Sequence, residues 1–365
     1  MDEAELIPVN IVTGFLGSGK TTVLRHVLAD PAFSRAAVLI NEFGEAGLDH
    51  LLVERLDDAT VLMESGCICC TLREDLRTTL RDLYSRRARG AVPRFDRLII
   101  ETTGLADPAP VMATVMTDPM LRHHLRIGNV VTTVDAVNAS ASFDRFAQSR
   151  KQVALADRIL LTKTDLADEA RCAGVAERIA ALNPQVRIER TVHGAAGPDV
   201  LTGLGSANAT ERAAEAEGWL AAAASYRDRL SSAGAQFAGA RRAAFQGEAV
   251  SADEEVRTLM LTLDEPIEWA TFGLWLSLLV ARHGEKLLRF KGLLDVEGSD
   301  SPVVLHGIHS LLHPPEHLDR WPGATRQSLL VFIVQGLPPA LIERSLRRFI
   351  ALGAGIRTAG AAMAP

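Results

Sequence analysis

Residues 14–22 read G-F-L-G-S-G-K-T-T, and this stretch decides the fold. An apolar run at 7–12 precedes it and a helical pattern at 23–28 follows it, which gives the order strand, glycine-rich loop, helix. Glycines let backbone N–H groups turn toward phosphate oxygens, and the start of a helix adds a partial positive charge. The fixed positions of the phosphate-binding loop pattern are all filled, by Gly14, Gly19, Lys20 and Thr21.

Lys20 and Thr21 carry the chemistry expected of such a loop. Lys20 is placed to reach the β- and γ-phosphates, and the Thr21 hydroxyl is placed to bind Mg²⁺. A second motif, E-T-T-G at 101–104, ends another apolar strand pattern. Glu101 can hold Mg²⁺ or its water, and the Gly104 N–H can contact the γ-phosphate. We therefore expect Lys20, Thr21 and Glu101 to support hydrolysis of a bound nucleotide.

The sequence T-K-T-D at 162–165 follows a further strand pattern and predicts a site for the base. The Asp165 carboxylate can accept both the N1–H and the N2–H of guanine, a donor pair that adenine lacks, so it would select GTP. Lys163 would lay its alkyl stem along the base. Thr162 stands where the guanine motif usually carries Asn, which removes one amide contact. The alternative is an ordinary helix N-cap at Thr164 or Asp165.

Three of the four cysteines cluster in the loop G-C-I-C-C at 66–70, as Cys67, Cys69 and Cys70. Three thiolates suit Zn²⁺ or another divalent metal, with a fourth ligand from a carboxylate, an imidazole or water. Glu42, in N-E-F-G-E at 41–45, is our candidate for that fourth ligand. An incomplete protein ligand set suits a site that must release its metal. The alternative is three buried cysteines that pack as small hydrophobic residues.

Strand patterns alternate with helical ones up to about residue 190, and we count six of them. This order predicts an α/β domain at 1–205, a doubly wound and mostly parallel sheet of the P-loop NTPase type. An Ala-rich stretch at 206–253 is interpreted as a helical linker or insertion. A smaller α+β domain is expected at 254–350, with a strand over 303–312 and a closing helix over 340–350. The Gly/Ala-rich tail at 351–365 is expected to be disordered.

Composition excludes several classes of function. The chain has 365 residues, 47% of them hydrophobic, and a net charge of -6, which argues against a nucleic-acid partner. No apolar run is long enough to span a membrane, and the acidic start is not a secretory signal, so we expect a cytoplasmic protein. Four histidines crowd the second domain and form either a metal-handling patch or, as their spacing favours, a set of surface residues: His306, His309, His313 and His317.

Taken together, these motifs resemble the CobW family of P-loop GTPases, relatives of the GTPases that mature nickel hydrogenase and urease. The resemblance rests on the five motifs above. In the second domain it rests on R-F-K-G-L-L at 289–294, H-G-I-H at 306–309 and the strand pattern at 329–334. It implies a GTP hydrolase that acts as a metallochaperone, with GTP or GDP, Mg²⁺ and Zn²⁺ or Co²⁺ as ligands. The matching nucleotide-loop positions are Gly14, Gly17, Ser18, Gly19, Lys20, Thr21 and Thr22, and the matching metal-binding cysteines are Cys67, Cys69 and Cys70.

These motifs suggest a hypothesis for the mechanism. GTP and Mg²⁺ would order the segments 41–49 and 101–107, which flank the cysteine loop, so that hydrolysis changes metal affinity and permits transfer to a client metalloprotein. No arginine finger or catalytic glutamine is identifiable, so hydrolysis is expected to be slow until a client or a second subunit arrives, with a nucleotide-dependent homodimer as one form. The alternatives are a kinase, an activator for cobalt in a metalloenzyme or in cobalamin synthesis, and a zinc sensor or storage protein.

Overall fold

A computed structural model of the chain describes residues 6–40, 61–64, 72–202, 216–221, 255–322 and 326–362. The chain divides into two compact units. The first comprises Met1–Ala180 and Val186–Asn208, and the second comprises Ala181–Gln185 and Ala209–Pro365. Each unit has a sheet and a hydrophobic core of its own.

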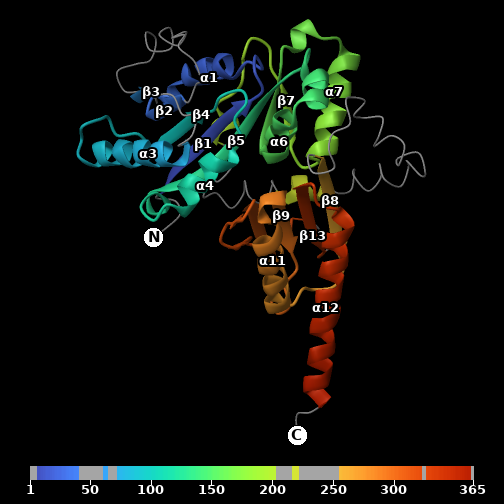
Figure 1. Cartoon of the computed structure of the whole chain (residues 1–365). Helices are drawn as coiled ribbons and strands as arrows, with labels where there is room; N and C mark the ends of the chain where they lie inside the picture. The colour runs from blue at the N-terminus through green and yellow to red at the C-terminus, as the bar shows by residue number, and fades with distance from the viewer. Residues whose placement is uncertain are drawn as a thin grey trace. The chain divides into compact units, whose positions relative to one another are not determined.

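The first unit is built on a seven-stranded sheet in the order β3-β2-β4-β1-β5-β6-β7 (Figure 1). Every neighbouring pair is parallel, which confirms the predicted doubly wound fold. The strands are β1 (Ile7–Gly14), β2 (Ala36–Ile40), β3 (Val61–Glu64), β4 (Arg97–Glu101), β5 (Leu125–Asp135), β6 (Arg158–Thr162) and β7 (Arg187–Arg190). The sequence patterns predicted six strands and missed β7, because this edge strand reads R-I-E-R and both of its arginines are exposed.

The helices of the first unit bury apolar stripes against this sheet. They are α1 (Lys20–Leu28), α3 (Leu72–Ala88), α4 (Ala109–Thr117), α5 (Ala139–Arg145), α6 (Ala147–Leu155), α7 (Glu169–Leu182) and α8 (Asp199–Thr202), with 3₁₀ turns η2 (Pro31–Phe33), η3 (Leu121–His123) and η4 (Thr164–Leu166). The buried face of α1 carries Val23, Leu24, Val27 and Leu28, the spacing of one side of a helix. These side chains share a core with Val12 of β1 and Ile99 of β4, so the start of α1 is fixed to the sheet.

The strand register brings four strand ends to one level of the sheet. Val12 of β1 pairs with Glu101 of β4, Glu101 pairs with Ile40 of β2, and Ile40 pairs with Glu64 of β3. The carboxyl ends of these parallel strands therefore share one edge, which is where ligands bind in such folds. The chain leaves this edge into residues 41–45 after β2 and into residues 65–70 after β3.

A buried carboxylate, Asp118, fixes the helix α3. Its side chain lies just after α4, is 1% exposed, and accepts hydrogen bonds from the N–H groups of Met120 and Leu121 at 3.0 Å each. Its Oδ2 lies 2.7 Å from Arg81 Nη2 and 3.3 Å from Arg77 Nε, both on α3. Burial acts to raise the pKa of Asp118, but the hydrogen bonds from Leu121, Arg81 and Met120 outweigh it and hold that pKa below its ordinary value.

We expect Asp118→Asn to lower the free energy of unfolding by about 2 kcal/mol at pH 7, because two charge-assisted contacts are lost. A carboxylate with a depressed pKa stabilises the fold above its unfolded pKa, and that contribution disappears as pH falls through the folded pKa. The difference between wild type and variant, measured by urea unfolding, should therefore shrink below about pH 4. Asp82→Asn on the same helix, whose carboxyl is 53% exposed, is the matched control. An equal effect of both variants would contradict the role of Asp118.

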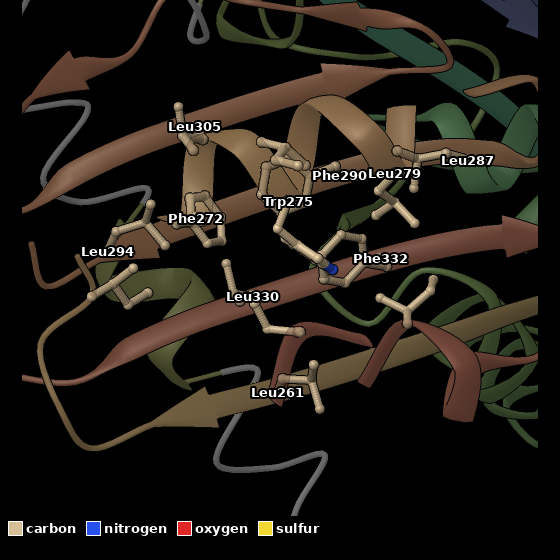
Figure 2. Packing of buried hydrophobic residues seen from close by; sticks show 14 of the residues in the cluster. Leu261, Phe272, Trp275, Leu279, Leu287, Phe290, Leu294, Leu305, Leu330 and Phe332 are labelled. Atoms are coloured by element: carbon tan, nitrogen blue, oxygen red, sulfur yellow. The ribbon is translucent and has the colours of Figure 1, made fainter. Parts of the chain in front are cut away.

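The second unit contains an antiparallel sheet in the order β11-β10-β9-β13-β8, with β12 paired to β10. Its elements are β8 (Val256–Leu263), α11 (Trp269–His283), η6 (Gly284–Lys286), β9 (Leu287–Leu294), β10 (Val303–Ile308), β11 (Leu311–Leu312), β12 (Glu316–His317), β13 (Ser328–Gln335) and α12 (Pro339–Ala362). Figure 2 shows Phe272 and Trp275 of α11 packed against Phe290 and Phe332 of the sheet. The Trp275 indole N–H donates to Ser345 Oγ of α12 at 3.0 Å, so both helices are tied to one core.

Two expectations for this unit are wrong. The predicted strand at 303–312 is interrupted by a turn in which His309 adopts a φ of 51°, so β10 ends at Ile308 and β11 follows. The tail expected to be disordered from residue 351 continues α12 as far as Ala362. Alanine is the strongest helix former, and a Cβ on Gly353 would lie 2.7 Å from Thr271 Oγ1, so this glycine allows α12 to approach α11. None of the described helices combines the length and the apolar character that crossing a membrane requires.

Candidate functional site

The loop between β1 and α1 has the backbone that its glycines predict. Gly14, Gly17 and Gly19 have φ angles of 145°, 69° and 93°. At Gly14 a Cβ would lie 2.5 Å from the backbone oxygen of Thr133, so this position requires glycine. Gly19 is the N-cap of α1 and offers no side-chain cap, which leaves the first N–H groups of the helix to an external acceptor. The loop therefore fits a phosphate group.

Three side chains of the predicted catalytic set lie at this loop. Lys20 Nζ donates to the carbonyl oxygens of Gly14 at 3.0 Å and Phe15 at 3.4 Å, so it lies across the loop. Thr21 Oγ1 donates to Glu101 Oε1 at 2.8 Å, and Glu101 is only 5% exposed. A hydroxyl and a carboxylate in contact are hard oxygen ligands of the kind that Mg²⁺ prefers. The structure thus brings Lys20, Thr21 and Glu101 together, as the motifs predicted.

A network of hydroxyls fixes the loop from the neighbouring strands. Ser18 Oγ and Thr133 Oγ1, on the loop and on β5, share a hydrogen bond of 2.6 Å. Thr162, at the end of β6, donates its hydroxyl to the Ser18 carbonyl at 2.7 Å. The residue that replaces the usual Asn of the guanine motif therefore contacts the phosphate loop. This contact connects the predicted base segment to the predicted phosphate segment.

The base segment begins directly after β6. Lys163 has a φ of 55°, and its Nζ donates to Asp135 Oδ2 of β5 at 2.8 Å. Burial acts to raise the pKa of Asp135, but hydrogen bonds from Lys163, Asn138 and the Val137 N–H outweigh it and hold that pKa below its ordinary value. Asp165 lies in η4 and is exposed, and no hydrogen bond or ion pair joins its carboxylate to another residue of the described ranges. The carboxylate can therefore accept from an external donor pair.

A turn after β7 also borders this site, and the sequence motifs did not include it. The turn is stabilised by a hydrogen bond of 2.8 Å from Thr191 Oγ1 to the Ala195 carbonyl, and Thr164 of the base segment donates to the Thr191 carbonyl at 3.4 Å. Gly194 has a φ of 78°, and a Cβ there would lie 2.7 Å from the Thr22 carbonyl of α1. The available signal was a glycine shortly after a strand, which is a weak one in a chain with 28 glycines.

The loop after β4 lies directly against the phosphate loop. Thr102 donates from its backbone N–H to the Val12 carbonyl at 3.0 Å and from its hydroxyl to Thr13 Oγ1 at 2.8 Å. A Cβ on Gly104 would lie 2.8 Å from the backbone nitrogen of Leu16. Glycine at position 104 therefore permits the close approach that a contact between this loop and a terminal phosphate requires.

The predicted metal ligands Glu42, Cys67, Cys69 and Cys70 lie outside the described residues. The strands that lead to them are described: β2 ends at Ile40 and β3 ends at Glu64, and these two residues pair in register. Both segments therefore begin at neighbouring strand ends, on the same edge as Gly14 and Glu101. Within the described ranges, no three Cys, His, Asp or Glu side chains are placed to hold a metal ion.

The four histidines of the second unit do not converge on one point. The rings of His306 and His313 are 6.2 Å apart, His309 Nδ1 lies 3.1 Å from the Glu285 carbonyl, and His317 lies on β12. Burial, reinforced by the charges of Lys291, His313 and Arg289, holds the pKa of His306 well below its ordinary value. The imidazole of His306 is therefore neutral at physiological pH and packs edge-on against Trp219.

Comparison with known proteins covers both units. Residues 8–190 match the CobW/HypB/UreG nucleotide-binding domain, and residues 256–350 match the cobalamin synthesis protein CobW C-terminal domain. The chain is 32% identical to the zinc chaperone YjiA of Escherichia coli over 91% of this chain and 95% of the relative. It is 30% identical to the zinc chaperone CobW of Pseudomonas aeruginosa over 94% and 92% of the two chains. The crystal structure of Zn(II)-bound YjiA GTPase from E. coli superposes with a TM-score of 0.67 at 26% identity, covering 94% of this chain and 99% of that one.

Proposed function

The chain belongs to the CobW/HypB/UreG family of P-loop GTPases, and from this premise we propose that it is a metallochaperone that binds zinc at its cysteine loop and delivers it to a client metalloprotein under the control of GTP. It is a GTPase, and relatives that align over most of its length are named zinc chaperones. Cobalt is the alternative cargo, since thiolate and carboxylate ligands accept both metals.

The nucleotide is assigned to the edge of the parallel sheet. The loop from Gly14 to Thr22, with Gly17, Ser18 and Gly19, holds the phosphates through its N–H groups and the start of α1. Lys20 moves from the loop carbonyls to the β- and γ-phosphates, and Gly104 meets the γ-phosphate from the other side. Thr21 and Glu101 are the residues that would hold Mg²⁺, which supplies charge neutralisation at the phosphates.

The guanine base is assigned to the segment after β6. Asp165 accepts the N1–H and N2–H of guanine, and the Lys163 stem, held by Asp135, lies along the base. Thr162 supports the phosphate loop through Ser18. The family of the chain and the open carboxylate of Asp165 both support GTP over ATP.

Zinc is assigned to Cys67, Cys69 and Cys70, with Glu42 as the fourth ligand. The proposed coupling of metal and nucleotide is supported by one observation. The register places the ends of β1, β2, β3 and β4 on one edge of the sheet. Glu42 follows β2 by two residues and Cys67 follows β3 by three. The Glu42 segment therefore starts from the strand beside Glu101, and the cysteine segment starts from the next strand beyond it on the same edge. A change in phosphate contacts at this edge can therefore alter the ligand geometry of the metal. By linkage, zinc must change nucleotide affinity by the same factor.

Completion of the site by a partner is part of the proposal. The contacts described at the phosphate loop include no arginine that reaches it, so intrinsic hydrolysis is slow and a client or a second copy of the chain accelerates it. Such control suits a chaperone, because hydrolysis then coincides with delivery. A nucleotide-dependent homodimer is one form that this control can take.

The test is the Zn²⁺ affinity of the full chain in two nucleotide states, measured by competition with a chromophoric chelator. We expect the affinity with GDP to differ at least about tenfold from that with a non-hydrolysable GTP analogue and Mg²⁺, equivalent to about 1.4 kcal/mol of coupling. The difference should vanish in a variant with Cys67, Cys69 and Cys70 replaced by Ser. Cys172→Ser, a buried cysteine of α7 outside the loop, is the matched control and should keep the difference.

Other outcomes separate the alternatives. Equal zinc affinities in both nucleotide states would leave the GTPase standing, remove the switch and favour a zinc sensor or storage protein. A phosphorylated acceptor among the products, instead of free phosphate alone, would indicate a kinase. A coupling seen with Co²⁺ and absent with Zn²⁺ would reassign the cargo.

A further inference from the structure

Gln152 of α6 connects this helix to the loop that follows β4. The side chain is 1% exposed, and its Nε2 donates to the carbonyl oxygens of Gly104 at 3.1 Å and Ala106 at 3.0 Å. Two carbonyl acceptors require the NH₂ end of the amide to face them, so this orientation is chemically determined. The remaining amide oxygen has no hydrogen-bond partner among the described residues. The hydrogen bonds of the Gln152 amide therefore all go to the loop after β4.

The helix that carries Gln152 is itself fixed to the sheet. The Gln152 carbonyl accepts the hydroxyl of Thr132, on β5, at 3.0 Å. Phe146, the N-cap of α6, packs its ring 4.7 Å from that of Phe15 in the phosphate loop. Gln152 and Phe15 also line a common pocket between the phosphate loop, β5, α5 and α6. The Gln152 side chain is thus carried by a helix that is fixed to β5 and that also contacts the phosphate loop.

The loop held by Gln152 also contacts the phosphate loop. Gly104 lies against the backbone of Leu16, and its carbonyl accepts the hydrogen bond from Gln152. The hydrogen bond to the Gly104 carbonyl fixes the plane of the peptide that follows Gly104, and the bond to Ala106 fixes the loop two residues further on. Fixing two carbonyls removes conformational freedom that the loop would otherwise lose when it meets a phosphate.

We propose that Gln152 is a positioning residue that holds the Gly104 loop ready for the γ-phosphate and thereby sets the preference for GTP over GDP. The proposal rests on the nucleotide being bound at the phosphate loop. GDP lacks the γ-phosphate and makes no use of the Gly104 loop, so its affinity is independent of Gln152. In wild type, GTP binds to a loop that is already ordered. Without the two hydrogen bonds from Gln152, GTP must order the loop as it binds, and its affinity falls.

The test compares Gln152→Met with wild type in the full chain, using GDP and a non-hydrolysable GTP analogue with Mg²⁺. Methionine keeps the length of the side chain and removes both donors. We expect the analogue to bind about tenfold more weakly and GDP to bind within about twofold of wild type. Gln148→Met is the matched control, since Gln148 lies one turn earlier on α6 and is exposed, and it should change neither affinity.

The outcomes are distinguishable. Equal losses for both nucleotides, no loss for either, or tighter binding of the analogue would each overturn the role of Gln152. Failure of wild type to bind either nucleotide would instead overturn the assignment of the phosphate loop. If Gln152→Met does not fold, Gln152→Glu replaces it, because a carboxylate of equal size cannot donate to the two carbonyls and should weaken the analogue at least as much.

Discussion

Lys20→Ala is expected to reduce GTP hydrolysis at least about a hundredfold, because a charge that stabilises the transferring phosphoryl group is removed. In the structure the Lys20 ammonium donates to two backbone carbonyls of its own loop, those of Gly14 at 3.0 Å and Phe15 at 3.4 Å. These are neutral acceptors, and phosphate oxygens are stronger partners for an ammonium group. Release of inorganic phosphate, followed under saturating GTP and Mg²⁺, measures the effect.

Arg25→Ala is the matched control for this variant. Arg25 is an exposed cation on α1, five residues beyond Lys20, and its loss should leave turnover within about twofold of wild type. Thermal unfolding of both variants checks that the fold is intact. Unchanged turnover in Lys20→Ala would refute the assignment of the phosphate loop, and an equal loss in Arg25→Ala would point to a general charge effect on the site.

Lys20 and Thr21 both make hydrogen bonds within the protein, to the Gly14 carbonyl and to Glu101. The groups that we assign to phosphate and Mg²⁺ are therefore held in place by the protein itself. Such preorganisation reduces the ordering that binding must otherwise bring about. The same logic applies to the loop around Gly104, where Gln152 supplies the restraint.

Local chemistry made the fold and the phosphate site predictable from the sequence. Residues 14–22 combine a buried strand, glycines at positions that need positive φ and a helix start, and each of these is a short-range signal. Glu101 was predictable because it ends an apolar strand and precedes a glycine. The parallel direction of the strands then followed from the alternation of strands and helices.

What the sequence could not provide are contacts between residues that are distant along the chain. Gln152 and Gly104 are 48 residues apart, and no spacing rule connects an amide on one helix to a loop after another strand. The hydrogen bond between Thr162 and Ser18 joins residues 144 positions apart, so it was unpredictable for the same reason. The tail from residue 351 is helical where its Gly/Ala-rich composition predicts disorder. Composition does not reveal that close packing of α12 on α11 needs a glycine at position 353.

Asp165→Asn is expected to weaken GDP binding by about a hundredfold to a thousandfold, since two charge-assisted hydrogen bonds to guanine are lost and the new amide places a donor against the guanine amino group. The same change should favour a xanthine nucleotide, whose 2-oxo group can accept from the asparagine NH₂ while its N1–H donates to the asparagine oxygen. Competition between GDP and XDP for the site, measured with a fluorescent nucleotide, gives both affinities.

The position of Asp165 allows the Asp165→Asn substitution to test base recognition without a change in stability. The carboxylate is exposed and makes no ion pair within the described ranges, so replacing it should leave the unfolding temperature unchanged. Asp168→Asn is the matched control, because Asp168 lies three residues on and accepts the Arg171 N–H at 2.7 Å, an N-cap contact that asparagine keeps. GDP affinity within twofold of wild type in Asp165→Asn would mean that the segment after β6 is a helix cap, and the base would then be sought at the turn after β7, where Gly194 lies against the start of α1.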